Sequence, residues 1–285
     1  MADAPGASEV VAHATTFLFV PGDRPDRFAK AANSGADVVI LDLEDAVANH
    51  QKADALAHVV AALTTPHAEI PGGTLRAIVR VNADDLSGDI ALLSNVGERE
   101  EHGLIGIMLP KAEDEESVRQ IITAMHGVPV IPLIETARGL VNVNEIAASP
   151  GVARLAFGAV DFGRDLDATD PAIFDFARAQ IVIASRAAGL VGPIDSPCVS
   201  IDDTAIILAE STRARDFGFT GKMCIHPGQC AHVASGFVLT PEQVEWARKV
   251  VRLEGSATKL DGQMVDKPIV DRAKRILERA KDYLD

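Results

Sequence analysis

Eight short apolar runs, rich in β-branched residues, recur along the chain, and longer stretches with helical periodicity separate them. This alternation is typical of repeated βα units, in which helices cover a parallel sheet. Eight such units in one chain of 285 residues predict the α/β class and a (β/α)8 TIM barrel. The predicted strands are Phe17–Val20, Val38–Leu43, Ala77–Val81, Ile105–Leu109, Val128–Ile134, Arg154–Phe157, Leu190–Ile194 and Lys222–Ile225.

Helices are expected between the strands, and two more after the last strand form a C-terminal helical extension. Gly189 and Gly218 stand where left-handed caps would end two of the helices. Thr240, Pro241 and Gln243 supply a capping residue, a first-turn proline and a capping-box glutamine for the extension. The predicted helices are Pro25–Asn33, Gln51–Leu63, Gly88–Ser94, Glu115–His126, Leu140–Ala148, Ile173–Ala188, Asp203–Asp216, 240–253 and Pro268–Tyr283.

The chain shows no linker or low-complexity stretch that would separate two ordinary domains. We expect a flexible N-terminus over residues 1–15, the barrel over 16–235 and the helical extension over 236–285. The 27 basic and 41 acidic residues give a net charge of −14, which repels phosphate backbones, so we expect no nucleic-acid partner. No apolar run reaches the roughly 20 residues that cross a bilayer, and no signal-peptide pattern opens the chain. A cytoplasmic protein with no membrane partner is therefore expected.

Three cysteines, Cys198, Cys224 and Cys230, make an odd number without a C-x-x-C pair. This spacing predicts neither a disulfide framework nor a structural zinc site. We expect all three to be reduced and mostly buried.

The ends of the predicted strands are unusually polar, and in a barrel of this kind chemistry takes place at the C-terminal ends of the strands. Glu135 and Asp161 follow successive strands, so their carboxylates can converge on one Mg²⁺ ion. The same two residues also precede helical stretches, where acidic side chains are favoured as helix caps. The residues alone leave these two interpretations equally open.

An acidic cluster and an arginine follow the second and third strands. Asp42, Glu44 and Asp45 can support a metal site or hold an arginine, although at least one of them can simply cap a helix. Arg80 ends an apolar strand, where an unpaired guanidinium would be unfavourable, so it must pair with a carboxylate. We favour a substrate carboxylate over one from the protein.

Positive charge is concentrated in the first βα segment, at Arg24, Arg27 and Lys30. These side chains can bind phosphate groups of a bulky substrate or can form a solvated helix face, and the spacing does not choose. Lys111 is expected to be an exposed loop lysine, because nothing around it in the sequence would depress its pKa. His226 is expected to fix a loop rather than to act in acid-base chemistry.

Nucleotide-binding, hydrolase-elbow and zinc-protease motifs are absent from the sequence. Several of the segments described above together resemble the citrate lyase beta subunit (CitE-like) branch of the HpcH/HpaI aldolase family. The resemblance covers the chain from about Thr16 to the C-terminus, and its motifs occur in order at successive strand ends. The motifs are Leu18–Asp23, Ala36–Val47, Arg80–Asn82, Met108–Glu113, Leu133–Gly139, Phe157–Phe162, Cys224–Pro227 and Gly262–Asp266.

The resemblance implies a Mg²⁺-dependent carbon-carbon lyase that cleaves 3-hydroxy-acyl thioesters such as citryl-, malyl- or citramalyl-CoA. It implies that Glu135 and Asp161 bind the metal and that Arg80 grips the carboxylate end of the substrate. It also implies that Asp266 comes from the C-terminal segment of a neighbouring subunit, in a homo-oligomer that is a trimer or a hexamer. We expect Asp266 to exchange a proton with the product thioester, and Glu44 and Asp45 to hold Arg80 or metal-bound water.

Two positions depart from the family pattern. Thr15 stands where many members have an arginine, which affects CoA phosphate binding, and Val160 stands where many have a glutamate. Two other functions fit the same motifs: a malyl-CoA thioesterase that uses water at the same metal site, and a non-catalytic or carrier-dependent subunit of a lyase complex. The substrate is accordingly an acyl-CoA or an acyl-carrier thioester.

Overall fold

The computed structural model describes residues 6–70, 72–83, 86–253, 258–260 and 263–281. These residues form two compact units, one ending at Gly236 and the other beginning at Phe237. This division lies one residue from the boundary expected from the sequence. Each unit is described separately below.

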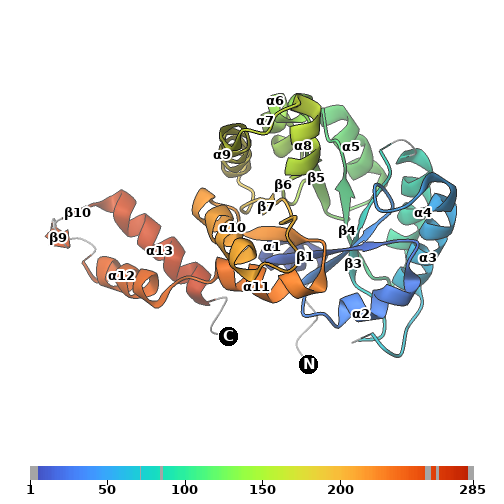
Figure 1. The fold of residues 1–285 in the computed structure, drawn as a ribbon, viewed down its shortest axis with the longest axis horizontal. Coiled ribbons are helices and arrows are strands. Elements are labelled where there is room, and N and C mark those ends of the chain that lie inside the picture. Colours follow the sequence, from blue (N-terminus) through green and yellow to red (C-terminus); the bar gives the residue numbers. More distant parts are fainter. Residues whose placement is uncertain (1–5, 71, 84–85, 254–257, 261–262, 282–285) are drawn as a thin grey trace. The chain divides into compact units, whose positions relative to one another are not determined.

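A closed barrel of eight strands forms the first unit, and the strands follow one another in sequence order around it (Figure 1). Every pairing is parallel, and β1 closes the barrel by pairing with β8, where Phe17 lies opposite Met223. The predicted (β/α)8 barrel is therefore confirmed. The strands are β1 Thr16–Pro21, β2 Val38–Asp42, β3 Ala77–Arg80, β4 Leu104–Leu109, β5 Val130–Ile134, β6 Ala156–Phe157, β7 Ile194–Asp195 and β8 Gly221–Cys224.

Helices surround the barrel between successive strands (Figure 1). Gly218 adopts the predicted left-handed cap of α10, with φ 110°, and Gly189 likewise has a positive φ after α9. The sequence did not predict α1, before β1, α8, directly after β6, or α11, after β8. The helical segments are α1 Ala7–His13, η1 Pro25–Arg27, α2 Phe28–Ala32, η2 Asn49–Gln51, α3 Lys52–Thr64, α4 Leu86–Gly97, α5 Glu115–Ala124, α6 Ala137–Val141, α7 Val143–Ala148, α8 Ala159–Leu166, α9 Pro171–Ala187, α10 Thr204–Phe217 and α11 Pro227–Phe237.

The N-terminal segment is ordered from Ala7, so the expectation of a flexible stretch over residues 1–15 is wrong for residues 7–15. Helix α1 covers residues 7–13, and Val11 is fully buried in the barrel core. The buried Arg154 holds this helix, because its guanidinium donates hydrogen bonds to the carbonyl oxygens of Val11 (2.9 Å) and Ala14 (2.8 Å). These hydrogen bonds join residues that are 140 or more positions apart in the sequence, so a local sequence pattern could not predict them.

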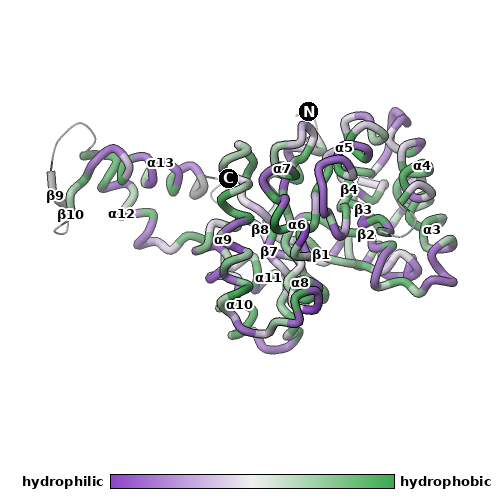
Figure 2. The backbone as a smooth tube through the Cα atoms, turned by 90° about the horizontal axis from the view of Figure 1, so that it is seen from above, coloured by the Kyte–Doolittle hydropathy of each residue, from purple (hydrophilic) through white to green (hydrophobic). Residues whose placement is uncertain are grey.

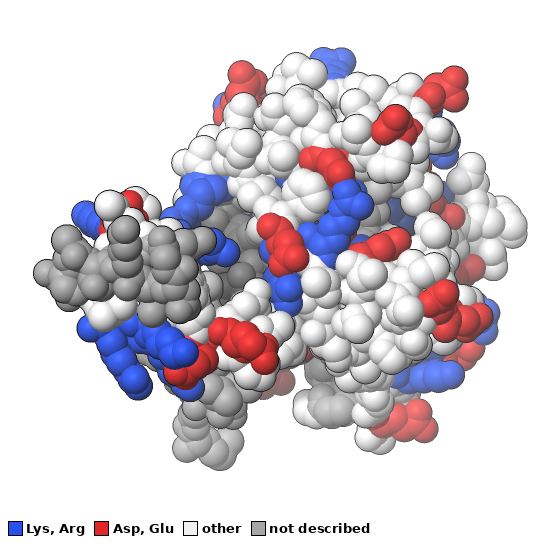
Figure 3. All heavy atoms as spheres, turned by 60° about the vertical axis from the view of Figure 1, so that its left-hand side comes forward, with Lys and Arg blue, Asp and Glu red and all other residues white. Residues whose placement is uncertain are grey.

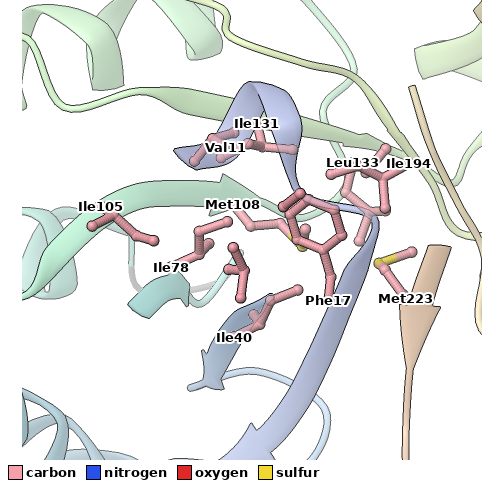
Figure 4. Close-up of a cluster of buried hydrophobic side chains, with 13 residues drawn as sticks. Val11, Phe17, Ile40, Ile78, Ile105, Met108, Ile131, Leu133, Ile194 and Met223 are labelled. Atoms are coloured by element: carbon pink, nitrogen blue, oxygen red, sulfur yellow. The ribbon is translucent and has the colours of Figure 1, made fainter. Parts of the chain in front are cut away.

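The barrel interior is filled by apolar side chains from nearly every strand (Figure 4). On β2, Val38 and Ile40 both join this core, as the two-residue period of a strand requires. Met108, Leu133 and Met223 come from β4, β5 and β8 and meet in the same cluster. The polar residues at the strand ends therefore lie at the end of a packed apolar barrel core.

The C-terminal unit is a helical pair with a small hairpin: α12 Pro241–Arg252, β9 Thr258–Leu260, β10 Gln263–Val265 and α13 Lys267–Lys281. Both helices were predicted, and the capping box of Thr240 and Gln243 is present. The antiparallel hairpin of β9 and β10 was not predicted. Hydrophilic and hydrophobic residues alternate along α12 and α13 (Figure 2), and their apolar faces pack on each other through Ala247, Val250 and Ala273.

All three cysteines are buried, and none forms a disulfide, as the sequence indicated. No described helix combines the length and the apolar character needed to cross a bilayer. On the face drawn in Figure 3, basic and acidic side chains lie next to one another.

Candidate active site

The C-terminal ends of β2 to β5 bring a connected set of charged side chains to one rim of the barrel. Asp42 and Arg80 are the last residues of β2 and β3, and they lie opposite each other in the strand register. Lys111 and Glu135 follow β4 and β5 directly. Parallel strands in sequence order place these residues side by side although the chain separates them widely.

Arg80 pairs with carboxylates of the protein. Its Nε and Nη2 each donate to a different oxygen of Asp42 at 2.7 Å, and Nη1 lies 3.1 Å from Oε2 of Glu44. Asp45 is more distant, at 4.0 Å, and is exposed. The expectation that a substrate is the main partner of Arg80 is corrected here, because Asp42 engages one edge of its guanidinium. Two of its five N–H donors are thereby used.

The environment of Arg80 keeps it positively charged. Burial alone would lower the pKa of Arg80, but the hydrogen bond and charge of Asp42, with the charges of Glu44 and Glu135, raise it above the ordinary value. The guanidinium carbon also lies 4.8 Å from the ring centre of Phe19 on β1, a cation-π contact.

Glu44 is buried between Arg80 and the ammonium of Lys111, which donates a hydrogen bond to Oε1 of Glu44. Its other oxygen, Oε2, has no hydrogen-bond partner among the described residues. Burial raises the pKa of Glu44, even though Arg80 and Lys111 both favour its ionised form. The backbone N–H of Glu44 donates to Asp42 at 3.0 Å, which fixes the start of the loop.

Lys111 lies in the loop after β4 with 36% of its side chain exposed, as predicted, but it is not an isolated surface lysine, because it belongs to this network. Its backbone N–H donates to Oε1 of Glu135 at 2.8 Å, and its ammonium binds Glu44. Desolvation would lower the pKa of Lys111, but the Glu44 hydrogen bond and the charges of Glu44, Asp45 and Glu135 outweigh it and raise that pKa. Lys111 is therefore a cation, as the sequence indicated, and not a candidate Schiff-base residue.

Glu135 is the most deeply buried carboxylate of the predicted metal pair, with 2% of the residue exposed. Burial raises its pKa to about 8, and the negative charges of Glu44 and Asp161 add to this rise. Gly158, after β6, approaches it so closely that a Cβ atom there would lie 2.5 Å from Oε2. The absence of a side chain at Gly158 therefore leaves the room that the Glu135 carboxylate occupies.

Asp161 lies in the first turn of α8, a position that the backbone N–H groups of a helix end favour for a carboxylate. Its side chain is 21% exposed, and Arg164 lies 3.0 Å from its Oδ1. Its charge acts on Glu135, so the two carboxylates share one electrostatic environment. One buried and one partly exposed carboxylate fit a Mg²⁺ ion, which takes its remaining ligands from water or substrate oxygens. No group of three or more metal-binding side chains occurs among the described residues.

Two residues outside the sequence-based set support the acidic loop. The ammonium of Lys52 donates to the carbonyl oxygens of Leu43 (2.8 Å) and Glu44 (3.0 Å) and to the side chain of Asn82. Asn82 lies at a predicted strand end and inside the Arg80–Asn82 motif, and this position could have identified it as a site residue. Lys52 begins a helix and carries no such signal.

The remaining predicted site residues make other contacts within their own units. Arg24 pairs with Asp26 through two hydrogen bonds of 2.9 and 2.8 Å, and Lys30 is exposed on α2. Asp266 belongs to the C-terminal unit, where it caps α13 by accepting the N–H of Ile269 at 3.2 Å. The structure thus assembles Glu44, Arg80, Glu135 and Asp161 at the rim and describes Asp266 in the other unit.

Three further positions noted in the sequence lie in local structure outside this network. Nδ1 of His226 accepts the N–H of Gly228 at 3.1 Å, which is the loop-fixing contact expected from the sequence. Thr15 donates its backbone N–H to Asp37 at 2.9 Å. Val160 is 61% exposed in the first turn of α8, beside Asp161.

Comparisons with known proteins agree with this architecture. The HpcH/HpaI aldolase/citrate lyase family matches residues 15–227. A citrate lyase subunit beta-like protein of Mycobacterium tuberculosis is 36% identical over 278 residues, which cover 93% of this chain and 94% of that protein. An L-malyl-CoA/beta-methylmalyl-CoA lyase of Cereibacter sphaeroides is 32% identical over 307 residues, 93% of each chain.

A solved structure extends the likeness to the whole fold. The crystal structure of CitE from Mycobacterium tuberculosis, in complex with magnesium, acetoacetate and coenzyme A, superposes with a TM-score of 0.79. The sequences are 33% identical, and the match covers 95% of this chain and 99% of that chain. With the closed barrel and its charged rim, these matches show that the chain belongs to the HpcH/HpaI aldolase/citrate lyase family.

Proposed function

We propose that this protein is a Mg²⁺-dependent carbon-carbon lyase that cleaves a 3-hydroxy-acyl thioester of the citryl-, malyl- or citramalyl-CoA type. The products are a keto acid and an acetyl or acyl thioester. The observation that carries the proposal is the buried Glu135 carboxylate, which shares its electrostatic environment with Asp161 and Arg80. The lyase among the relatives and the magnesium and coenzyme A in the similar crystal structure support it.

Glu135 and Asp161 are the residues that would hold Mg²⁺, which when bound supplies Lewis-acid polarisation of the substrate oxygen. The buried carboxylate fits this role, because burial first, and then the negative charges of Glu44 and Asp161, raise its pKa, and a bound cation would stabilise the ionised form. Asp161, in the first turn of α8, adds a second carboxylate.

Arg80 is proposed to bind the carboxylate end of the substrate. Asp42 fixes one edge of the guanidinium with two hydrogen bonds, so the group points in one direction and its remaining donors are oriented in advance. Glu44 and Asp45 position Arg80 from the opposite side. Arg24 and Lys30 are proposed to contact the phosphates of the acyl-CoA or acyl-carrier substrate.

Cleavage breaks the bond between the hydroxyl-bearing carbon and the carbon next to the thioester. The hydroxyl group gives its proton to water as the keto acid forms, and the electron pair of the broken bond passes to the thioester enolate. The enolate carbon then takes a proton from the carboxyl group of Asp266, which we assign to a neighbouring subunit in a trimer or hexamer, and solvent returns a proton to that carboxylate.

The proposal is tested by incubating the purified protein with citryl-, malyl- and citramalyl-CoA, with Mg²⁺ or with EDTA. We expect a free keto acid from one ester and only with Mg²⁺. Asp161→Asn should lower turnover at least about a hundredfold, whereas Asp167→Asn, which removes a similar charge from the exposed end of α8, should not. A hydroxy acid in place of the keto acid would identify a thioesterase instead, and no product from any free CoA ester would favour a carrier-dependent subunit.

A further inference from the structure

Lys111 contacts two of the three buried carboxylates of the site, through two different parts of the residue. Its backbone N–H donates to Oε1 of Glu135 at 2.8 Å. Its ammonium donates to Oε1 of Glu44, whose other oxygen faces Nη1 of Arg80 at 3.1 Å. One residue therefore connects the proposed metal ligand with the proposed substrate-binding arginine.

The backbone of Lys111 is in the left-handed region, with φ 47°. For a residue other than glycine this conformation is unfavourable by roughly 1 kcal/mol, because Cβ crowds the following carbonyl oxygen. A positive φ sets the direction of Cβ and of the carbonyl group relative to the N–H of the same residue, so this conformation accompanies an N–H that meets Glu135 and a side chain that reaches Glu44. The surrounding structure therefore maintains a strained backbone at the point where it contacts the metal ligand.

The side chain at this position has its own contact. Glycine would adopt the left-handed backbone without strain, so the hydrogen bond to Glu135 by itself does not require a lysine. What lysine adds is the ammonium beside Glu44, a carboxylate of which only 6% of the side chain is exposed. A buried carboxylate next to Arg80 needs compensating charge, and Lys111 supplies part of it.

The other oxygen of Glu135 remains available. No described residue donates a hydrogen bond to Oε2, which packs against the backbone of Gly158. The hydrogen bond from Lys111 to Oε1 and the contact with Gly158 together restrict how the carboxylate can turn, while Oε2 keeps its lone pairs for a cation. A fixed carboxylate loses less conformational freedom when it binds a cation.

We propose that Lys111 is a positioning residue with two separable parts: its left-handed backbone N–H orients Glu135 for Mg²⁺, and its ammonium holds Glu44 against Arg80. The inference rests on the proposed function, since it assigns a metal to Glu135 and a substrate carboxylate to Arg80. Lys111 itself touches neither the metal nor the reacting atoms.

Two substitutions separate the parts. Lys111→Gly keeps the N–H and the left-handed backbone but removes the ammonium, whereas Lys111→Val disfavours the left-handed backbone through its branched Cβ. Isothermal titration of the full-length protein with Mg²⁺ should give Lys111→Gly a Kd within about threefold of the wild type. Lys111→Val should bind Mg²⁺ about 10- to 100-fold more weakly, the range found when partners of metal ligands are removed.

The ammonium is tested by kinetics. Lys111→Gly should raise the KM for the thioester about tenfold at saturating Mg²⁺, since Arg80 is less well held, and Lys111→Arg should restore most of the loss. His126→Val is the matched control, because His126 also has a positive φ, 44°, at the end of α5. It should lower thermal stability without weakening Mg²⁺ binding.

The Mg²⁺ affinities decide the inference. Equal affinities of Lys111→Gly and Lys111→Val would overturn it, as would a loss of Mg²⁺ binding in the His126→Val control. If the wild type binds Mg²⁺ but cleaves no thioester, the lyase proposal fails while the two affinities still test Lys111. A wild type that does not bind Mg²⁺ would overturn both.

Discussion

At the scale of single residues, the rim of the barrel is a set of buried charges that compensate one another. Asp42, Glu44 and Glu135 are buried, and Arg80 and Lys111 supply the opposing cations. The negative charge of Glu135 is the least neutralised of the three, because the hydrogen bond that it accepts from the described residues comes from an uncharged backbone N–H. Its raised pKa follows from this arrangement and makes its protonation sensitive to pH near neutrality.

The affinity for Mg²⁺ should therefore rise with pH. Glu135 is protonated below its pKa of about 8 in the metal-free protein, so Mg²⁺ must displace a proton. We expect the affinity to increase about tenfold per pH unit between roughly pH 5 and 7 and to level off above about pH 8. Titrations in buffers of different ionisation enthalpy should show about one proton released per Mg²⁺ at pH 6.5 and none at pH 9.

The metal-free protein should show the opposite trend in stability. The folded-state pKa of Glu135 lies above its ordinary value of 4.5, so the native state binds the proton more tightly than the unfolded chain. This contribution to the free energy of unfolding is present at low pH and is lost as pH rises toward 8. Mg²⁺ affinity that does not change between pH 5 and 8 would contradict both expectations.

Gly158 should be essential for the metal site but not for the fold. A methyl group there would lie 2.5 Å from Oε2 and 2.7 Å from Cβ of Glu135, so Gly158→Ala must displace that carboxylate. We expect Mg²⁺-dependent turnover to fall at least about a hundredfold with little change in the circular dichroism spectrum. Gly97→Ala adds the same methyl group where the nearest atom is 3.4 Å away, and it should retain activity.

At the scale of elements, two short helices depend on the barrel around them: α8 carries Asp161, and α1 is held by Arg154. Helix α8 carries Asp161 to the rim directly after β6, a strand of only two residues. At another place, α1 is held by Arg154, which is fully buried and also donates to the carbonyl oxygen of Gly192 at 2.9 Å. Both elements are too short to form without tertiary contacts.

Arg154→Met should strongly destabilise the barrel. The substitution introduces an apolar side chain of similar length but leaves the buried carbonyl oxygens of Val11 and Ala14 without the Arg154 donor. We expect the free energy of unfolding, measured in urea, to fall by about 3 to 5 kcal/mol. Arg99→Met, at an exposed position after α4, should change it by less than about 0.5 kcal/mol. A similar small effect of both variants would show that Arg154 does not secure α1.

At the scale of the whole molecule, the chain divides into a barrel that carries Arg80, Glu135 and Asp161 and a small unit that carries Asp266. The two functions assigned to them, substrate binding and proton exchange, are therefore separated along the chain. In the proposed oligomer each site combines the barrel of one subunit with Asp266 of its neighbour. This arrangement can be tested without removing any part of the protein.

Two inactive variants should complement each other in mixed oligomers. Asp266→Asn subunits retain an intact barrel, and Arg80→Gln subunits retain an intact C-terminal unit, so a mixed neighbour pair rebuilds one complete site. When the two are co-expressed in equal amounts, about a quarter of the sites should be complete, with activity in that proportion. Each variant alone should be nearly inactive. Absence of recovery, with mixed oligomers verified by distinct tags, would show that Asp266 serves its own subunit or none.

The sequence by itself determined the class of fold, because the alternation of apolar strands and helical stretches permits few architectures. It also determined which residues stand at strand ends, and hence Arg80, Glu44, Glu135 and Asp161 as candidates. It did not reveal α1, α8, α11 or the β9–β10 hairpin, whose short lengths leave little periodic signal.

Only the tertiary structure decided how the candidates pair. Lys111 binds Glu44 across 67 positions, and Arg80 binds Asp42 across 38. Such contacts exist because a closed barrel brings successive strand ends together, and a local pattern contains no information on which neighbour a charge will meet. A lysine that appears exposed from its sequence surroundings is therefore part of the site, and an arginine expected to await a substrate already has protein partners.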